Sequence, residues 1–190
     1  MSETLFLSCD AIGSIVQKIG ADVVMDELID RLDIALGEFD QESFEVPPRD
    51  GFRYDQPHTG LVEWMPLMRR GSCVTLKMVG YHPQNPISYQ LPTILSTLSL
   101  FDVRTGHMKV LADGSFLTCL RTGAASAVAS RILADAESRV LGLIGAGAQS
   151  MSQLYALAET RATERVAATY FELQHQSILA LDFPHLLEFG

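Results

Sequence analysis

Cysteine is scarce in this chain of 190 residues and is not arranged for cross-linking or metal binding. The three cysteines, Cys9, Cys73 and Cys119, are odd in number and widely spaced, and no CxxC pair occurs. Such spacing predicts neither a disulfide framework nor a zinc site. The five histidines are scattered without an HExxH pattern, so we expect no bound metal. We interpret the three cysteines as reduced thiols, which favours a cytoplasmic location for the protein.

Long apolar runs and basic stripes are also missing. No apolar run reaches the roughly 18 residues of a membrane helix. The first residues, MSETLFLSCDAIGS, lack the basic region that opens a secretory signal peptide. No cluster of lysine and arginine is available to neutralise nucleic-acid phosphates. The sequence therefore predicts no membrane partner and no nucleic-acid partner.

Charge is present but unevenly distributed. The formal net charge is −9. Residues 1–50 contain twelve acidic and three basic side chains, whereas residues 51–190 contain eleven of each. Apolar residues make up 47% of the chain, which is enough for a packed core. We interpret the acidic segment as the solvated face of amphipathic helices.

Two helices are predicted at the start of the chain and a sheet after them. Residues 10–39 carry an apolar stripe with acids opposite; Asp10 is expected to cap the first helix and Gly20 to end it. Residues 41–60 are rich in turn-forming residues. Strand-like runs follow at 61–68, 72–81, 93–102 and 107–118, in a mostly antiparallel sheet. Thr105-Gly106 and Asp113-Gly114 are interpreted as hairpin tips.

The pattern changes after residue 120. Residues 121–136 are small and alanine-rich, which favours a helix packed closely on a sheet. An apolar strand at 140–144 then runs into the glycine turn GAGAQS, followed by a helix from Met151 and a second strand at 165–171. Glycines in such a turn let the backbone approach a pyrophosphate, and the next helix offers its N–H groups. The GxGxxG match is partial because Ser150 replaces the third glycine, so an ordinary strand–helix turn is the alternative.

Several segments together resemble the ornithine cyclodeaminase/mu-crystallin family. They are ESFEVPPR, LVEWMP, LKMVGYHPQNP, LPTILSTLSLFDVRTG, LADGSFLTCLRTGAASAVASRILA and VLGLIGAGAQS, in the family's order and spacing. The resemblance covers roughly the first 165 residues and is weak over the N-terminal helices. It implies an α/β fold: a mixed α+β substrate and dimerisation domain over residues 1–120, followed by the beginning of a Rossmann-type domain over residues 121–190.

The resemblance also implies NAD as cofactor and an amino acid as substrate. In ornithine cyclodeaminase, NAD takes hydride from the α-carbon of ornithine, the terminal amine closes the ring, ammonia leaves, and the cyclic imine is reduced to proline. NAD is thus regenerated in each turnover. Other members reduce cyclic ketimines or act as alanine or opine dehydrogenases. A homodimer, or pairing with a longer paralogue, is expected.

The family's site residues can be transferred position by position. Arg49, Lys77 and Arg121 match substrate-binding residues, with Lys77 and Arg121 also expected to serve catalysis. Cofactor contacts are expected from Thr93, Arg121, Gly145, Gly147, Ala148 and Gln149. A guanidinium binds a carboxylate bidentately, which suits an amino-acid substrate. The positive charges of these side chains would also disfavour protonation of the substrate α-amine. Hydride leaves more easily from a carbon that bears a neutral amine.

Each transferred residue has a simpler interpretation. The alternative for Arg49 is a loop arginine, with Arg53 close enough to be the true equivalent. Lys77 could be a surface lysine; pleat alternation puts it on the face opposite Leu76 and Met78. Arg121 could simply bind a neighbouring carbonyl group. His82 resembles an acid–base group, but a histidine in a turn is more often structural.

Two departures from the family bear on activity. The acidic residue that binds the ribose hydroxyls belongs near Tyr170, where only Glu172 is available, and the sequence is atypical from about Ala167. The family's catalytic aspartate lies further along than these 190 residues extend. We therefore interpret the sequence as a C-terminally shortened member with impaired conversion of L-ornithine to L-proline and ammonia. A ketimine reductase, an alanine or opine dehydrogenase, and a non-catalytic dimerisation module are the alternatives.

Overall fold

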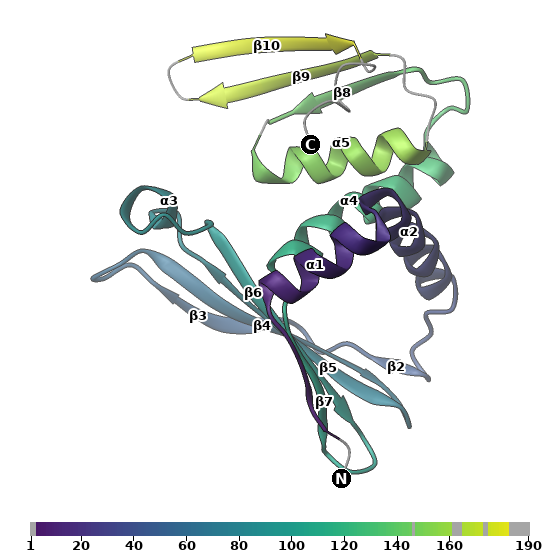
Figure 1. Ribbon diagram of the computed structural model, residues 1–190, viewed down its shortest axis with the longest axis vertical. Helices are drawn as coiled ribbons and strands as arrows, with labels where there is room; N and C mark the ends of the chain where they lie inside the picture. Colours follow the sequence, from purple (N-terminus) through teal and green to yellow (C-terminus); the bar gives the residue numbers. More distant parts are fainter. Residues whose placement is uncertain (1–2, 146, 161–164, 173–174, 183–190) are drawn as a thin grey trace. The chain divides into compact units, whose positions relative to one another are not determined.

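The computed structural model describes residues 3–145, 147–160, 165–172 and 175–182, the last two ranges by their backbone. The chain divides into two compact units (Figure 1). The first comprises Met1–Lys18 and Glu38–Thr118, and the second comprises Ile19–Gly37 and Cys119–Gly190. Each unit is described by itself below.

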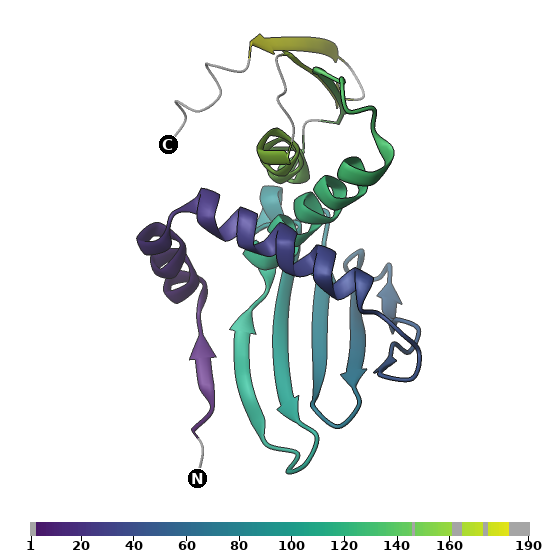
Figure 2. The same cartoon turned by 90° about the vertical axis from the view of Figure 1, so that its right-hand side faces the viewer.

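A seven-stranded sheet forms most of the first unit. Its strand order is β1-β7-β6-β5-β4-β2, and β3 also pairs with β4. All pairs are antiparallel except β1 with β7, which run parallel (Figure 2). The strands are β1 (Leu5–Leu7), β2 (Phe44–Glu45), β3 (Asp50–Tyr54), β4 (Gly60–Arg69), β5 (Cys73–Tyr81), β6 (Ile94–Asp102) and β7 (Met108–Asp113).

The central strands form where alternating apolar residues predicted them. The turn between β6 and β7 contains Gly106 at a φ of +70°, a left-handed conformation that favours glycine, so the predicted Thr105-Gly106 tip is confirmed. The short helix α3 (Asn85–Ser88) lies in the connection between β5 and β6. Strands β1, β2 and β3 were not predicted: β1 and β2 are two or three residues long, and β3 lies in the turn-rich segment.

The hairpin predicted at Asp113-Gly114 is wrong, because helix α4 (Ser115–Leu133) begins there. The carboxylate of Asp113 accepts the N–H of Ser115 at 2.9 Å, and Gly114 O accepts the N–H of Thr118 at 2.7 Å. The hydroxyl of Ser115 also accepts the N–H of Ser96 from β6 at 3.0 Å. These bonds start a helix at the end of β7 instead of returning the chain as a strand.

The predicted break between the first two helices is confirmed. Helix α1 (Cys9–Ile19) and helix α2 (Ala21–Gly37) are separated by Gly20, whose φ is +100°. The predicted cap Asp10 is wrong: Ser8 precedes the helix, and its hydroxyl accepts the N–H of Ala11 at 3.2 Å. Helix α1 belongs, except for Ile19, to the first unit, and α2 belongs to the second.

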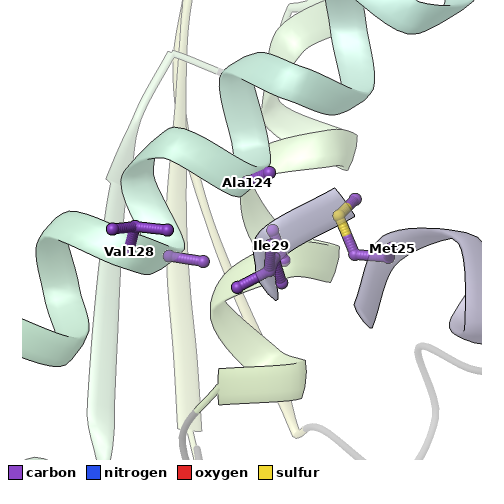
Figure 3. Packing of buried hydrophobic residues seen from close by; sticks show 6 residues of the cluster. Met25, Ile29, Ala124 and Val128 are labelled. Carbon is purple, nitrogen blue, oxygen red and sulfur yellow. The ribbon is translucent and has the colours of Figure 1, made fainter. Parts of the chain in front are cut away.

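The second unit has an apolar core built from three helices. Met25 and Ile29 of α2 are fully buried against the small face of α4 and against Ala156 of α5 (Ala148–Thr160). Figure 3 shows Met25 and Ile29 facing Ala124 and Val128. The alanine-rich stretch was predicted to pack on a sheet, but the cluster shows that it packs on α2 and α5.

A strand–helix–strand arrangement follows the helical core. Strand β8 (Val140–Ile144) leads through α5 to β9 (Arg165–Glu172), and the two strands pair in parallel, as a Rossmann-type start requires. Strand β10 (His175–Asp182) pairs antiparallel with β9. In the described part of the chain, no helix combines the length and apolarity needed to cross a membrane, and no cluster of three or more metal-binding side chains occurs.

Candidate functional site

Two arginines and a glutamate line a small cavity beside β3. Arg49 directly precedes β3, Arg53 lies within it, and Glu63 lies in β4. The cavity has a volume of about 210 Å³. Nη1 of Arg49 lies 3.8 Å from Oε2 of Glu63, and 68% of the arginine side chain is exposed. An ion pair this long and this open is weak, so the guanidinium can still bind a ligand carboxylate.

Gly51 makes room for the Glu63 side chain. The two residues are partners across β3 and β4. A Cβ atom at position 51 would collide with the carbonyl oxygen of Val62 and would lie 3.0 Å from Cγ of Glu63. Because residue 51 is a glycine, the Glu63 side chain can cross the neighbouring strand toward Arg49.

Lys77 shares a sheet face with Glu63. Lys77 is paired with Met65 on β4, and Glu63 is paired with Val79 on β5. Since successive side chains alternate between faces, Lys77 and Glu63 occupy diagonal positions on the same face. Lys77 is half-buried there. The structure thus brings an acid, a lysine and the predicted arginine to one side of the strands.

The remaining predicted residue of the first unit, Thr93, lies directly before β6. Its carbonyl oxygen accepts the backbone N–H of His82 at 2.9 Å. The imidazole of His82 forms a 2.7 Å hydrogen bond with the hydroxyl of Tyr54. Tyr54 is three residues from Gly51 along β3, so it lies on the face opposite Glu63 and Lys77. This placement favours a structural role for His82 over acid–base chemistry at the lysine.

The glycine turn has the backbone that an anion site needs. Gly145 has a φ of +96°, and a Cβ at Gly145 or Gly147 would meet nothing within 4 Å. Helix α5 begins at Ala148, so its first N–H groups face this open turn. Oε1 of Gln149 is buried without a hydrogen-bond partner among the described residues. The open space above the glycines fits a bound pyrophosphate-bearing cofactor, whereas Oε1 of Gln149 only accepts hydrogen bonds and so cannot bond to a pyrophosphate oxygen. Ala146 lies outside the described residues.

Arg121 lies in α4 and is exposed. Gly123, two residues after Arg121, lets α4 pack closely against α5. A Cβ at position 123 would collide with the carbonyl oxygen of Ser152 and would lie 3.2 Å from Cβ of Ala156. Arg121 and the glycine turn belong to the second unit, whereas Arg49, Lys77 and Thr93 belong to the first. Glu172 is the last residue of β9.

Glu63 is a candidate site residue that the sequence did not predict. The available signal was an acid in the middle of the apolar run LVEWMP, at a position where strand alternation predicts an inward side chain. An acid at such a position requires a partner, and Arg49 is the partner found.

Comparison with known proteins gives a consistent result. The family model described as "Ornithine cyclodeaminase/mu-crystallin family" matches residues 11–178. An L-lysine cyclodeaminase from Streptomyces rapamycinicus is 40% identical over 167 residues, which are 87% of this chain and 49% of the relative. The chain therefore spans about half the length of the curated relatives that it matches.

Two solved structures share the fold. A lysine cyclodeaminase, studied for its recognition of L-lysine, L-ornithine and L-2,4-diaminobutyric acid, aligns with a TM-score of 0.79 and 44% identity. An archaeal alanine dehydrogenase dimer with bound NAD aligns with a TM-score of 0.75 and 32% identity. Both alignments cover 87% of this chain and 48% of the other chain. The α/β architecture, including the start of a Rossmann-type domain, is confirmed.

Proposed function

The chain belongs to the ornithine cyclodeaminase/mu-crystallin family, and we propose that it functions as an NAD-dependent cyclodeaminase that converts L-ornithine to L-proline and ammonia. The observation that carries the proposal is the placement of Glu63 and Lys77 on one sheet face, with Arg49 beside Glu63. A diamino acid has one carboxylate and two amines, and this face offers cationic groups together with one acid.

Each side chain has a distinct task in this proposal. Arg49 binds the substrate carboxylate through its planar guanidinium, with Arg53 lining the same cavity. Glu63 accepts hydrogen bonds from the distal ammonium group. Lys77 adds positive charge, which lowers the pKa of the α-amine and so favours the neutral amine that oxidation requires. Arg121, which belongs to the second unit, is proposed by resemblance as a further catalytic and substrate-binding residue.

The cofactor in the proposal is NAD, which when bound supplies the acceptor and then the donor of the hydride exchanged with the substrate α-carbon. Gly145, Gly147, Ala148 and Gln149 would hold its pyrophosphate, since the turn is open and a helix begins directly after it. Thr93 and Arg121 are proposed as further cofactor contacts. The archaeal alanine dehydrogenase, which binds NAD, supports this choice.

We also propose that the chain pairs with a second copy or with a longer paralogue. The sheet face opposite Lys77 has exposed apolar side chains, among them Phe52 (68%), Met78 (38%) and Leu95 (38%). Exposed apolar side chains gathered on one sheet face favour association. The dimeric alanine dehydrogenase supports the same expectation.

The function is tested by incubating the purified chain with L-ornithine and a small amount of NAD. The proposal expects proline and ammonia in equal amounts, in excess of the NAD supplied, and no net NADH. Accumulation of NADH with an α-keto product would instead identify a dehydrogenase. NAD and ornithine binding without turnover would favour the non-catalytic module, and the absence of both would contradict the proposal.

A further inference from the structure

The small cavity beside β3 has a charged lining that sums to zero. Two of its lining residues, Arg49 and Arg53, are basic, and two others, Asp50 and Glu63, are acidic. All four belong to the first unit. With a volume of about 210 Å³, the cavity is smaller than the usual sites of drug-sized molecules, so it suits a ligand of amino-acid size.

Three of these charged side chains lie on the sheet face opposite the apolar face that we propose for pairing. Across β3 and β4, Gly51 is paired with Glu63, and Arg53 is paired with Leu61. Since side chains alternate along each strand, Arg53 and Glu63 share a face, in diagonal positions. Arg49 extends to the same side, because it contacts Glu63. A second copy on the apolar face would therefore not cover these three groups.

Two groups that would hold a substrate are paired with each other in the structure. Nη1 of Arg49 lies 3.8 Å from Oε2 of Glu63, and the glutamate side chain is 27% exposed. The other acid, Asp50, uses Oδ1 to accept the N–H of Gly51 at 2.8 Å. Arg53 forms no ion pair among the described residues. Glu63 is therefore the acid that a ligand must separate from Arg49.

A ligand with a single charge gains little at this pair. A carboxylate bound to Arg49 would take the arginine from Glu63 and would lie beside a second carboxylate, which repels it. An ammonium group bound to Glu63 would likewise lie near two guanidinium groups without an acid. A ligand with both charges instead replaces one ion pair by two charge-assisted hydrogen bonds. Separating the existing pair costs little because it is long and open.

We propose that the Arg49–Glu63 pair selects ligands that carry both a carboxylate and a separate ammonium group, with zero net charge, and rejects ligands that carry only one of the two. Binding is an exchange of partners: the ligand carboxylate takes Arg49, and the ligand ammonium takes Glu63. The inference rests on the proposed function in assigning the substrate carboxylate to Arg49. It adds that the site prefers ornithine with a neutral α-amine, because that form has zero net charge.

The test titrates three unbranched ligands into the wild-type chain and follows binding by NMR, which detects weak complexes. The ligands are 5-aminopentanoate, pentanoate and pentylamine. None of them is an α-amino acid, so turnover does not interfere. The wild type should bind 5-aminopentanoate at least tenfold more tightly than either ligand with a single charge, which is roughly the contribution of one charged hydrogen bond.

Two variants should strengthen one kind of binding while they weaken another. Glu63→Gln keeps the shape of the side chain and frees Arg49, so pentanoate should bind about threefold more tightly. The same variant should bind 5-aminopentanoate roughly tenfold more weakly, because the ammonium group loses its acid. Arg49→Gln frees Glu63, so pentylamine should gain and 5-aminopentanoate should lose by similar factors. Glu45→Gln, in the exposed pair with Arg70, is the matched control and should change none of the three affinities.

Tighter binding of the single-charge ligands by the two variants supports the exchange. The proposal is overturned if Glu63→Gln binds pentanoate no better than the wild type, if Arg49→Gln binds pentylamine no better, or if the wild type binds pentanoate as tightly as 5-aminopentanoate. These results do not depend on ornithine turnover. A chain that shows the tighter binding but forms no proline would support the exchange and contradict only the proposed reaction.

Discussion

Glu63 and Lys77 lie on one face of the sheet, on the adjacent strands β4 and β5 and two residues apart in register. Opposite charges in such diagonal positions are within reach of long side chains. The pair faces the same side as the cavity that Arg49 lines. An acid on β4 and a lysine on β5, in neighbouring positions of one sheet face, are the basis for proposing a diamino acid as substrate.

Replacing Glu63 by glutamine should weaken the binding of ornithine and have little effect on the stability of the fold. Glu63→Gln removes the charge that the distal ammonium requires, so ornithine affinity should fall about 10- to 100-fold, the loss typical of a charged hydrogen bond. Calorimetric titration with ornithine measures the change. Glu45→Gln, which alters the exposed 2.8 Å pair with Arg70, is the control and should bind normally. Equal losses in both variants would remove Glu63 from the site.

Replacing Lys77 by methionine should strongly lower turnover while the fold persists. Lys77→Met keeps the length of a half-buried side chain but removes its charge, so ornithine turnover should drop about 100-fold or more. Lys18→Met, at an exposed position of α1, is the control. Comparable turnover in the two variants, measured as ammonia release, would show that Lys77 only fills space.

Gly60→Ala should break the hydrogen bond between the Tyr54 hydroxyl and the His82 imidazole. The new Cβ would lie 2.6 Å from Nε2 of His82, so the bond to Tyr54 should be lost, and overpacking of this kind costs about 1–3 kcal/mol. Urea denaturation gives the change in unfolding free energy. Gly13→Ala is a matched control: it lies in α1 with nothing within 4 Å, and should gain about 0.5–1 kcal/mol. A stable Gly60→Ala protein with an unchanged His82 ring signal would disprove the steric argument.

Stability should depend on pH through Asp102, the last residue of β6. The ammonium group of Lys109, 2.7 Å away, holds the pKa of Asp102 at about 2, below its ordinary 3.8, and the Thr105 hydroxyl contributes. A lowered folded-state pKa gives stability that is complete above the unfolded value of 3.8 and is lost as pH falls toward 2. Unfolding free energies measured over that interval should therefore fall more steeply for the wild type than for Asp102→Asn. Parallel curves would contradict this assignment.

Sequence patterns predicted the parts of the fold that local residues determine. Alternation located β4, β5 and β6, and Gly20 located the break between α1 and α2 because both signals act over a few residues. The parallel pairing of β1 with β7 could not be predicted, since Leu5–Leu7 is too short to carry a pattern and its partner lies about a hundred residues away. The start of α4 was missed because Asp113-Gly114 suits a hairpin equally well.

The candidate site was predictable in its residue types but not in its grouping. Arg49 and Lys77 were identified by resemblance, and alternation correctly put Lys77 on the face opposite Leu76 and Met78. Glu63 was found only when strand pairing brought it beside Gly51 and Arg49. The roles of Thr93, Arg121 and the glycine turn stay predictions.

The most direct test of the account compares L-ornithine with L-norvaline, the same amino acid without its distal amine. Both are titrated calorimetrically into the wild-type chain with NAD present. Ornithine should bind at least tenfold more tightly, because only ornithine can pair with the Glu63 carboxylate. Equal affinities would mean that the Glu63 and Lys77 face does not recognise a diamino acid, and the proposed substrate would be wrong.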